Sequence, residues 1–174
     1  MTATTTLPAV AAPDDLVVEV VEWDDPEAAR LRAAQEAEMA VRYGGVDPAP
    51  AIDPRSIVVT LVARVDGRAV GTAAVRDVSG TDDRRGRGTA HPAATGEVKR
   101  VFVTADARGL GVARRLMAEL ERSARQVGFR RFVLETGTAQ PEAMGLYAAI
   151  GYEPIESFGD HCGSEQQRCY GKRL

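Results

Sequence analysis

One stretch, from Gly96 to Leu120, constrains the fold of this chain more than any other. It begins with apolar residues among polar ones, at Val98, Val101 and Val103, and this pattern predicts a strand that faces the core on at least one side. Gly109 and Gly111 follow. Beyond them apolar residues recur at helical spacing, at Ala113, Leu116, Met117, Leu120, Ala124 and Val127. The sequence therefore predicts a strand, a glycine-containing turn and an amphipathic helix.

A helix that begins at these glycines offers a place for an anion. Its first four N–H groups have no partner within the helix, and the aligned peptide dipoles leave about half a positive charge there. Gly109 and Gly111 have no Cβ to hold a phosphate away from the backbone, and Arg108 adds a fixed charge. We interpret the segment as a pyrophosphate cradle. Two alternatives stay open: a tight turn without a ligand, and a dinucleotide fingerprint, although Arg114 stands where that motif requires Gly or Ala.

The segment Arg108 to Ala113, Arg-Gly-Leu-Gly-Val-Ala, matches the Arg/Gln-x-x-Gly-x-Gly/Ala motif, and the chain resembles the GCN5-related N-acetyltransferase (GNAT) family. Three further segments match in the same order. They are the strand that holds Glu97, a strand from Phe132 to Glu135, and Leu-Tyr-Ala-Ala-Ile-Gly-Tyr at 146–152. The resemblance implies an acyltransferase that uses acetyl-CoA as co-substrate and needs no metal.

The composition of the chain argues against several other classes of protein. The formal net charge of −3 and the low aromatic content argue against a nucleic-acid partner. Cys162 and Cys169 do not make a disulfide framework, and with only two histidines a four-ligand zinc site is not expected. No run approaches the roughly 18 apolar residues of a membrane span. No export signal is evident at the N-terminus. We expect no membrane partner and a cytoplasmic location.

The length of 174 residues fits one domain. We expect a flexible tail over 1–14 and a single N-acetyltransferase domain over 15–174. Strands are predicted over 16–21, 56–65, 68–78, 98–103, 132–135, 152–158 and 165–172, and helices over 26–42, 112–127 and 141–150. This order predicts a mixed α/β fold. The resemblance specifies a mostly antiparallel sheet that is splayed at the cofactor groove and has helices on both faces, the acyl-CoA N-acyltransferase fold. The long loops at 44–54 and 79–95 are candidates for acceptor specificity.

The resemblance also assigns the residues that bind acetyl-CoA. The backbone of Val101, Phe102 and Val103 would pair with the pantetheine amides as an added strand does. Backbone N–H groups of one continuous loop would hold the pyrophosphate: Arg108, Gly109, Leu110, Gly111, Val112, Ala113 and Arg114. Gln140 stands where many members have an Asn that contacts CoA, so its longer side chain puts that contact in question.

Two residues match the family's catalytic positions. Glu97 is the candidate general base, acting directly or through water, and the alternative is a carboxylate paired with Lys99 or Arg100 or left in solvent. Tyr147 is the candidate general acid, because a phenol of pKa about 10 stays protonated at neutral pH and can donate to a thiolate. The alternative for Tyr147 is a core aromatic residue. A covalent route through Cys162, beside His161, is weaker because sequence neighbours rarely form a working pair.

The predicted activity is transfer of an acetyl group to a primary amine by direct attack in a ternary complex. We expect a small-molecule acceptor. A protein or peptide acceptor and a CoA-binding sensor without turnover are the alternatives. A second copy of the chain, as a homodimer, is a further candidate partner.

Overall fold

The structure, a computed structural model, describes residues 13, 15–45, 51–82 and 90–174. The expected tail at 1–14 lies outside this range except for residue 13, and so do 46–50 and 83–89 of the two long loops. The elements follow in this order: β1 (Val17–Val21), α1 (Pro26–Arg42), β2 (Ile57–Val65), β3 (Arg68–Asp77), β4 (Thr95–Val103), α2 (Val112–Gln126), β5 (Arg131–Gly137), α3 (Pro141–Ala149), β6 (Glu153–Pro154) and β7 (Gln167–Arg173). Two short 3₁₀ turns, Pro54–Ser56 and Ala105–Ala107, complete them.

The strands form one seven-stranded sheet in the order β1-β2-β3-β4-β5-β7-β6. Every neighbouring pair is antiparallel except β4 and β5, which run parallel. The predicted mixed, mostly antiparallel sheet is therefore confirmed. The strand predicted over 152–158 is wrong in length, because only Glu153 and Pro154 pair with β7. Pro154 has no N–H to extend a ladder, which suits the end of an edge strand.

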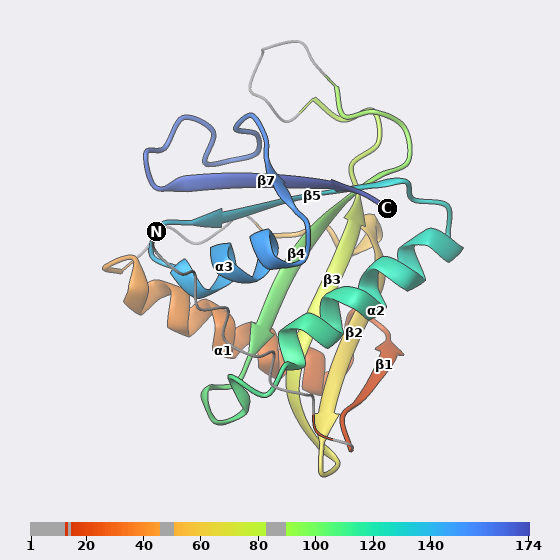
Figure 1. The fold of residues 1–174 in the computed structure, drawn as a ribbon, viewed down its shortest axis with the longest axis vertical. Coiled ribbons are helices and arrows are strands. Elements are labelled where there is room, and N and C mark those ends of the chain that lie inside the picture. Colours follow the sequence, from red (N-terminus) through yellow and green to blue (C-terminus); the bar gives the residue numbers. More distant parts are fainter. Residues whose placement is uncertain (1–12, 14, 46–50, 83–89) are drawn as a thin grey trace, which may run out of the picture.

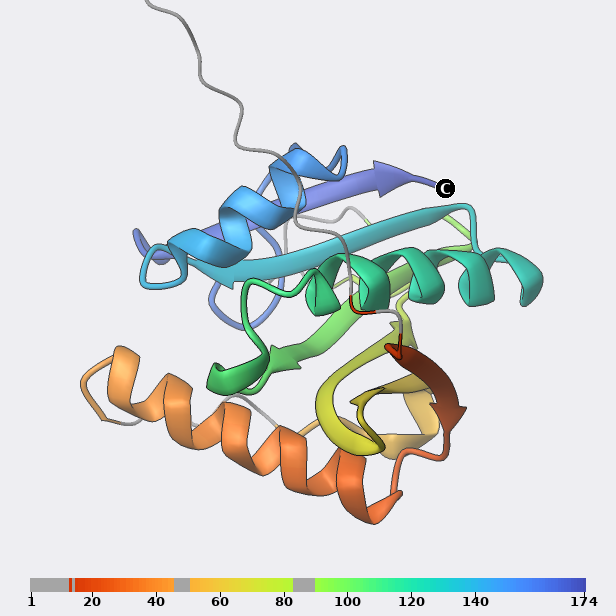
Figure 2. The same ribbon diagram turned by 60° about the horizontal axis from the view of Figure 1, so that its bottom comes forward.

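Helices cover both faces of this sheet, as expected (Figure 2). Leu61 and Ala63 of β2 belong to the cluster that includes Leu116 and Leu120 of α2. Val62, between them, belongs to a second cluster with Leu31 of α1. Since successive side chains of a strand point to opposite faces, α1 and α2 lie on opposite sides of the sheet. Figure 1 shows α3 beside α2 on the near side.

The start of α1 follows from its sequence. The carboxylate of Asp25 accepts hydrogen bonds from the backbone N–H groups of Glu27, at 2.9 Å, and Ala28, at 3.0 Å, and Pro26 occupies the first turn. Of the helix residues, only Ala28 and Leu31 are buried, so most of α1 presents polar side chains. Within the residues that the structure describes, no helix is both long and apolar enough to cross a membrane.

The parallel strands β4 and β5 separate after a short paired stretch. Their register runs from Thr95 opposite Arg131 to Val98 opposite Leu134, and no pair follows. Figure 1 shows β4 in green and β5 in cyan starting together and diverging as a V. A β-bulge on the other edge of β4 accompanies the divergence, with Arg100 at φ 58°. The predicted splay of the sheet is confirmed at this position.

Gly96 allows the paired part of β4 to pack closely, and this generates a prediction for stability. A Cβ at Gly96 would lie 2.6 Å from Cγ2 of Val75 and 3.0 Å from Cε1 of Phe132. Gly96→Ala is expected to lower the free energy of unfolding by about 1–3 kcal/mol through overpacking, measured by urea denaturation.

Gly145→Ala is the matched control. Gly145 lies within α3, and nothing stands within 4 Å of an added Cβ there. Alanine is expected to raise the free energy of unfolding by about 0.5–1 kcal/mol at this helical position. If Gly96→Ala were as stable as Gly145→Ala, the tight contact between β3, β4 and β5 would be refuted.

Candidate functional site

A groove of about 330 Å³ lies beside the last part of β4, where this strand has separated from β5, and is lined by residues of β4, α1, α3 and the loop that leads into α2. We call it the splayed groove. It is lined by most of the residues that the sequence assigned to acetyl-CoA and to catalysis: Val101, Phe102, Val103, Arg108, Gly109, Gly111, Val112, Ala113, Arg114, Gln140 and Tyr147. Leu110 is instead packed against the main core, and Glu97 does not line the groove.

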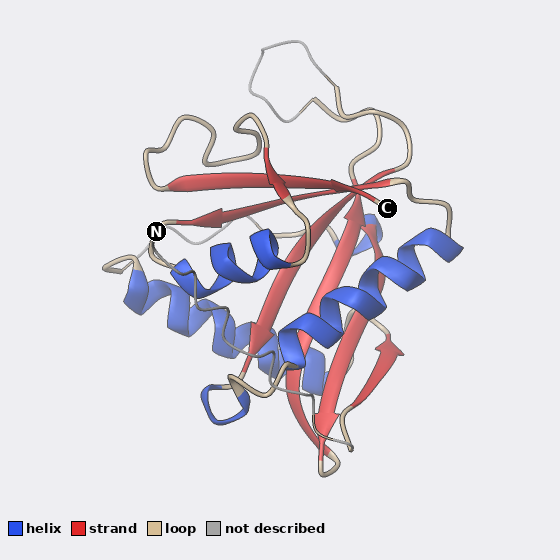
Figure 3. Cartoon of the chain, viewed as in Figure 1, coloured by secondary structure: helices blue, strands red, loops and turns tan. Residues whose placement is uncertain are grey.

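The beginning of α2 provides backbone donors at this groove. Figure 3 shows this helix starting after the loop that follows β4. Gly111 is the N-cap residue, with φ 76°, and it makes no side-chain cap. The first intrahelical bond runs from the N–H of Arg115 to the carbonyl of Gly111, at 3.0 Å. Among the described residues, none accepts a backbone hydrogen bond from the N–H groups of Val112, Ala113 or Arg114. Unpaired N–H groups at the start of a helix can bind an anion, and the assignment of a pyrophosphate to this loop stays a prediction.

Arg108, the predicted charge of the cradle, belongs to a network that crosses the groove. Its Nη2 lies 2.5 Å from Oε2 of Glu38, and its Nε donates to the carbonyl of Val103 at 3.1 Å. Glu38 also pairs with Arg42, at 2.7 Å, and Arg42 pairs with Glu142 of α3, at 2.5 Å. Burial alone would raise the pKa of Glu38, but hydrogen bonds from Arg108 and Arg42 outweigh it and hold that pKa below its usual value.

The open edge of β4 is partly occupied by side chains. Gln35 of α1 donates from Nε2 to the carbonyl of Val101, at 3.0 Å, as Arg108 does to Val103. The Oε1 atom of Gln35 is buried and has no hydrogen-bond partner among the described residues. A pantetheine chain that used the carbonyls of Val101 and Val103 would have to displace these two side chains. The backbone assignment at this edge therefore stays a prediction.

Tyr147 lies in the wall of the groove and also in the core. It is 6% exposed, and its ring centroid lies 5.8 Å from that of Tyr152 and 6.1 Å from that of Tyr170. Burial raises the pKa of the Tyr147 phenol above its ordinary value, so the hydroxyl stays protonated at neutral pH. The ring thus packs in the core, as the alternative for Tyr147 expected, and the residue also lines the groove, so its role as general acid stays a prediction.

Glu97 is enclosed by cations. It is 1% exposed, Arg76 donates from Nε to Oε2 at 2.6 Å, and Lys99 contacts Oε1. The pairing with Lys99 is one of the alternatives that the sequence left open, and Arg76 is an additional partner. Both oxygens of Glu97 are engaged, and the residue lines neither hollow of the site. Its role as general base stays a prediction.

A second, smaller hollow of about 160 Å³ adjoins the groove, and we call it the second pocket. It shares Gln35, Met39 and Gln140 with the groove. Its other lining residues come from the first long loop, β3, β4, β5 and the loop before β7: Ala51, Ile52, Arg76, Lys99, Arg100, Glu135, Asp160 and His161. The two hollows therefore meet at these three shared side chains.

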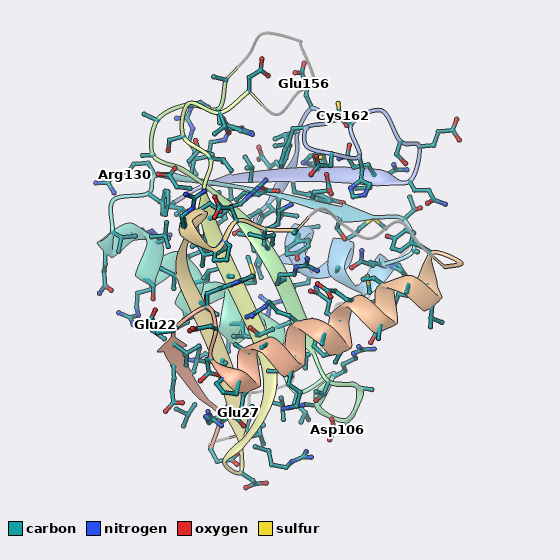
Figure 4. All side chains as sticks on the ribbon, turned by 180° about the vertical axis from the view of Figure 1, so that it is seen from behind. Glu22, Glu27, Asp106, Arg130, Glu156 and Cys162 are labelled. Carbon is teal, nitrogen blue, oxygen red and sulfur yellow. The ribbon has the colours of Figure 1, made fainter. Side chains whose placement is uncertain are left out.

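The loop before β7 does not arrange a thiol nucleophile. Nδ1 of His161 lies 2.8 Å from Oε1 of Glu135, whereas Sγ of Cys162 donates to the carbonyl of Ser157 at 3.6 Å. Figure 4 shows Cys162 at the end of the molecule opposite Asp106, which follows β4. The imidazole is thus oriented by Glu135 rather than by its sequence neighbour.

Sequence reasoning did not find Gln35, Glu38 or Arg76 as members of the site. Gln35 contacts a residue 66 positions away, and Arg108 contacts Glu38 across 70 positions. On a helix rich in charged residues Gln35 and Glu38 carry no local signal, and Arg76 is placed in the site only by the pairing of β3 with β4. Tyr43 accepts a hydrogen bond from Nε2 of Gln140, a residue that lines both hollows, at 3.1 Å.

Comparison with known proteins agrees with this geometry. The family model described as Acetyltransferase (GNAT) family matches residues 18–152. An IAA acetyltransferase from Azospirillum brasilense is 36% identical over 102 residues, which are 58% of this chain and 58% of that protein. This chain therefore matches somewhat more than half the length of that curated relative.

Two solved structures show the same fold. A protein from Klebsiella pneumoniae subsp. pneumoniae MGH 78578, assigned as an acyl-CoA N-acyltransferase, superposes with a TM-score of 0.72 at 26% identity, covering 91% of this chain and 97% of that one. A GNAT family acetyltransferase from Elizabethkingia anophelis, solved with acetyl-CoA bound, gives a TM-score of 0.61 at 14% identity, covering 93% of this chain and all of that one. With its splayed sheet, the open start of α2 and a family match over most of its length, the chain belongs to the GNAT family of acetyltransferases.

Proposed function

We propose that this protein is an N-acetyltransferase that transfers an acetyl group from acetyl-CoA to a primary amine of a small molecule in a ternary complex. The amine nitrogen forms a bond to the thioester carbonyl carbon, the C–S bond breaks, the ammonium proton leaves to a base, and the departing sulfur takes a proton. The observation that carries the proposal is the junction of two hollows at Gln35, Met39 and Gln140. It allows two substrates to meet without a covalent enzyme intermediate.

The residues of the splayed groove fit acetyl-CoA. The N–H groups of Val112, Ala113 and Arg114 are suited to a diphosphate, and an added Cβ at Gly109 would find nothing within 4 Å. Arg108 supplies a charge once the diphosphate competes with Glu38 for it. When bound, acetyl-CoA supplies an activated acetyl group. The relative from Elizabethkingia anophelis, which has acetyl-CoA bound in the same fold, supports this assignment.

Tyr147 is the proposed general acid and Glu97 the proposed general base. Tyr147 keeps its proton at neutral pH and lines the groove, so it can donate toward a leaving thiolate. Glu97 is enclosed, so the amine proton would reach it through a water molecule rather than by contact. Lys99 and Arg76, which hold Glu97, line the second pocket where the acceptor would bind.

A small acceptor suits the second pocket, whose volume of about 160 Å³ is less than half that of the groove. The proposed activity is tested by incubating the full chain with acetyl-CoA and a panel of small amines and peptides, with free thiol as the readout. Release of thiol that depends on the amine supports an enzyme. Binding of acetyl-CoA without release would identify a sensor, and a preference for peptides would identify a protein acetyltransferase.

Of three predictions for the proposed activity, the first concerns cofactor binding. Gly109 has φ 79°, and its missing Cβ leaves the cradle open. Gly109→Ala is expected to weaken CoA binding about tenfold or more, as loss of a charge-assisted hydrogen bond does, measured by isothermal titration calorimetry. Gly67→Ala is the control: Gly67 has φ 73°, also has open space, and lies in the hairpin between β2 and β3. Equal CoA affinity of the two variants would refute the cradle.

The second prediction concerns Tyr147. Tyr147→Phe is expected to lower kcat about 100-fold, the usual contribution of a general acid, with little change in the affinity for acetyl-CoA. Thiol release and calorimetry measure the two effects separately. Tyr152→Phe removes the same hydroxyl from a neighbouring core ring that does not line the groove, and it is expected to keep its activity. Full activity of Tyr147→Phe would remove this residue from the mechanism.

The third prediction concerns Glu97. If Glu97 accepts the proton, Glu97→Gln is expected to lower kcat/KM about 100-fold, measured by thiol release. Glu121→Gln is the control, because Glu121 is a buried carboxylate paired with Lys172 at 2.8 Å, outside both hollows. If kcat/KM were the same in Glu97→Gln as in Glu121→Gln, Glu97 would only hold its two cations.

A further inference from the structure

The second pocket carries opposite charges on its two sides. Arg76 of β3 and Lys99 of β4 lie on one side, together with Arg100. Glu135, from β5, and the loop residues Asp160 and His161 lie on the other. Since β4 and β5 diverge beyond Val98, the two groups stand on separate edges of the opening. The pocket is therefore dipolar rather than uniformly charged.

The cationic side retains one net charge and several unused donors. Arg76 and Lys99 share a single carboxylate, that of Glu97, which is 1% exposed. Their own side chains are 25% and 24% exposed, so they reach from the buried carboxylate to the pocket. Arg100 is neutralised by Glu36, at 3.0 Å. Two cations with one carboxylate leave one positive charge, and an ammonium and a guanidinium keep further N–H donors for an anion.

The anionic side is held in place by two hydrogen bonds. The carboxylate of Glu135 is 15% exposed, accepts from Nε2 of Gln167 at 2.5 Å and contacts Nδ1 of His161 at 2.8 Å. The Glu135 side of the pocket therefore offers negative charge to an amino group.

Resting on the proposed function, we propose that the acceptor is zwitterionic: an amine that also bears a carboxylate, as an amino acid does. Arg76 and Lys99 bind its carboxylate, and its amino group lies toward Glu135 and His161. One net positive charge matches a monoanion. A phosphate dianion would exceed that charge and would face Glu135 and Asp160 across a narrow pocket. The predicted occupant is therefore an amino carboxylate.

The test compares matched acceptors on the full chain with saturating acetyl-CoA. Amino acids, their carboxamides, the corresponding decarboxylated amines and aminoalkyl phosphonates are assayed for kcat/KM by thiol release. The wild-type chain is expected to favour the acid over its amide about 10- to 100-fold, the effect of one or two charge-assisted hydrogen bonds. Equal rates with acid and amide, or faster rates with the phosphonate, would overturn the proposal.

Variants of Arg76 test whether this residue causes the preference for the acid over its amide. Arg76→Gln is expected to reduce the ratio of acid to amide rates about tenfold, and Arg76→Lys, which keeps the charge, to retain most of it. Because the ratio compares two substrates on one protein, a loss of folded enzyme cancels. Arg68→Gln is the control: Arg68 lies on the same strand, is 70% exposed and pairs with Asp106. An unchanged ratio in Arg76→Gln would contradict the assignment.

The acceptor assay also tests the zwitterionic acceptor and the proposed N-acetyltransferase function separately. A chain that acetylates neutral amines as well as or better than amino acids refutes the zwitterionic acceptor and leaves the N-acetyltransferase function standing. A chain that binds acetyl-CoA and acetylates none of the amines refutes the proposed function itself.

Discussion

The separation of β4 from β5 after Val98 is the constraint on which the site depends. Within a sheet, each backbone N–H and C=O is paired with the next strand, and a strand edge that loses its neighbour inside a protein must find other partners. Here the carbonyls of Val101 and Val103 are satisfied by Gln35 and Arg108. Side chains can leave these positions at a much lower free-energy cost than a strand can. The divergence therefore creates an edge that is satisfied without a ligand and still accessible to one.

The need for polar partners at this strand edge also explains why the apolar face of α1 is weak. A helix that served only to cover the sheet would bury more than Ala28 and Leu31. The polar side of α1 instead provides Gln35 to β4 and Glu38 to Arg108, and Arg42 extends the network to Glu142 on α3. Since ion pairs at a partly exposed surface contribute little to stability, this network is better understood as fixing the geometry of the groove.

Much of this arrangement could be predicted from local sequence patterns. The rest depends on which residues of neighbouring strands stand opposite one another, and local patterns do not show this. Asp25 and Pro26 mark the start of α1, and Gly111 marks the start of α2, because capping and positive φ are properties of single residues. The environment of Glu97 had no such signal, because its partner Arg76 comes from another strand. Pairing in the sheet places Arg76 opposite Glu97, and only the three-dimensional register shows this.

Glu97 links the interior of the sheet to the second pocket. A carboxylate that is 1% exposed loses most of its hydration, and this cost is offset only when cations are held close to it. Arg76 and Lys99 do so, and they are thereby restrained themselves. A free Lys or Arg side chain has about 2 kcal/mol of rotamer entropy to lose on binding. Since the buried carboxylate has already restricted these two side chains, an anion that enters the pocket meets donors that are largely preorganised.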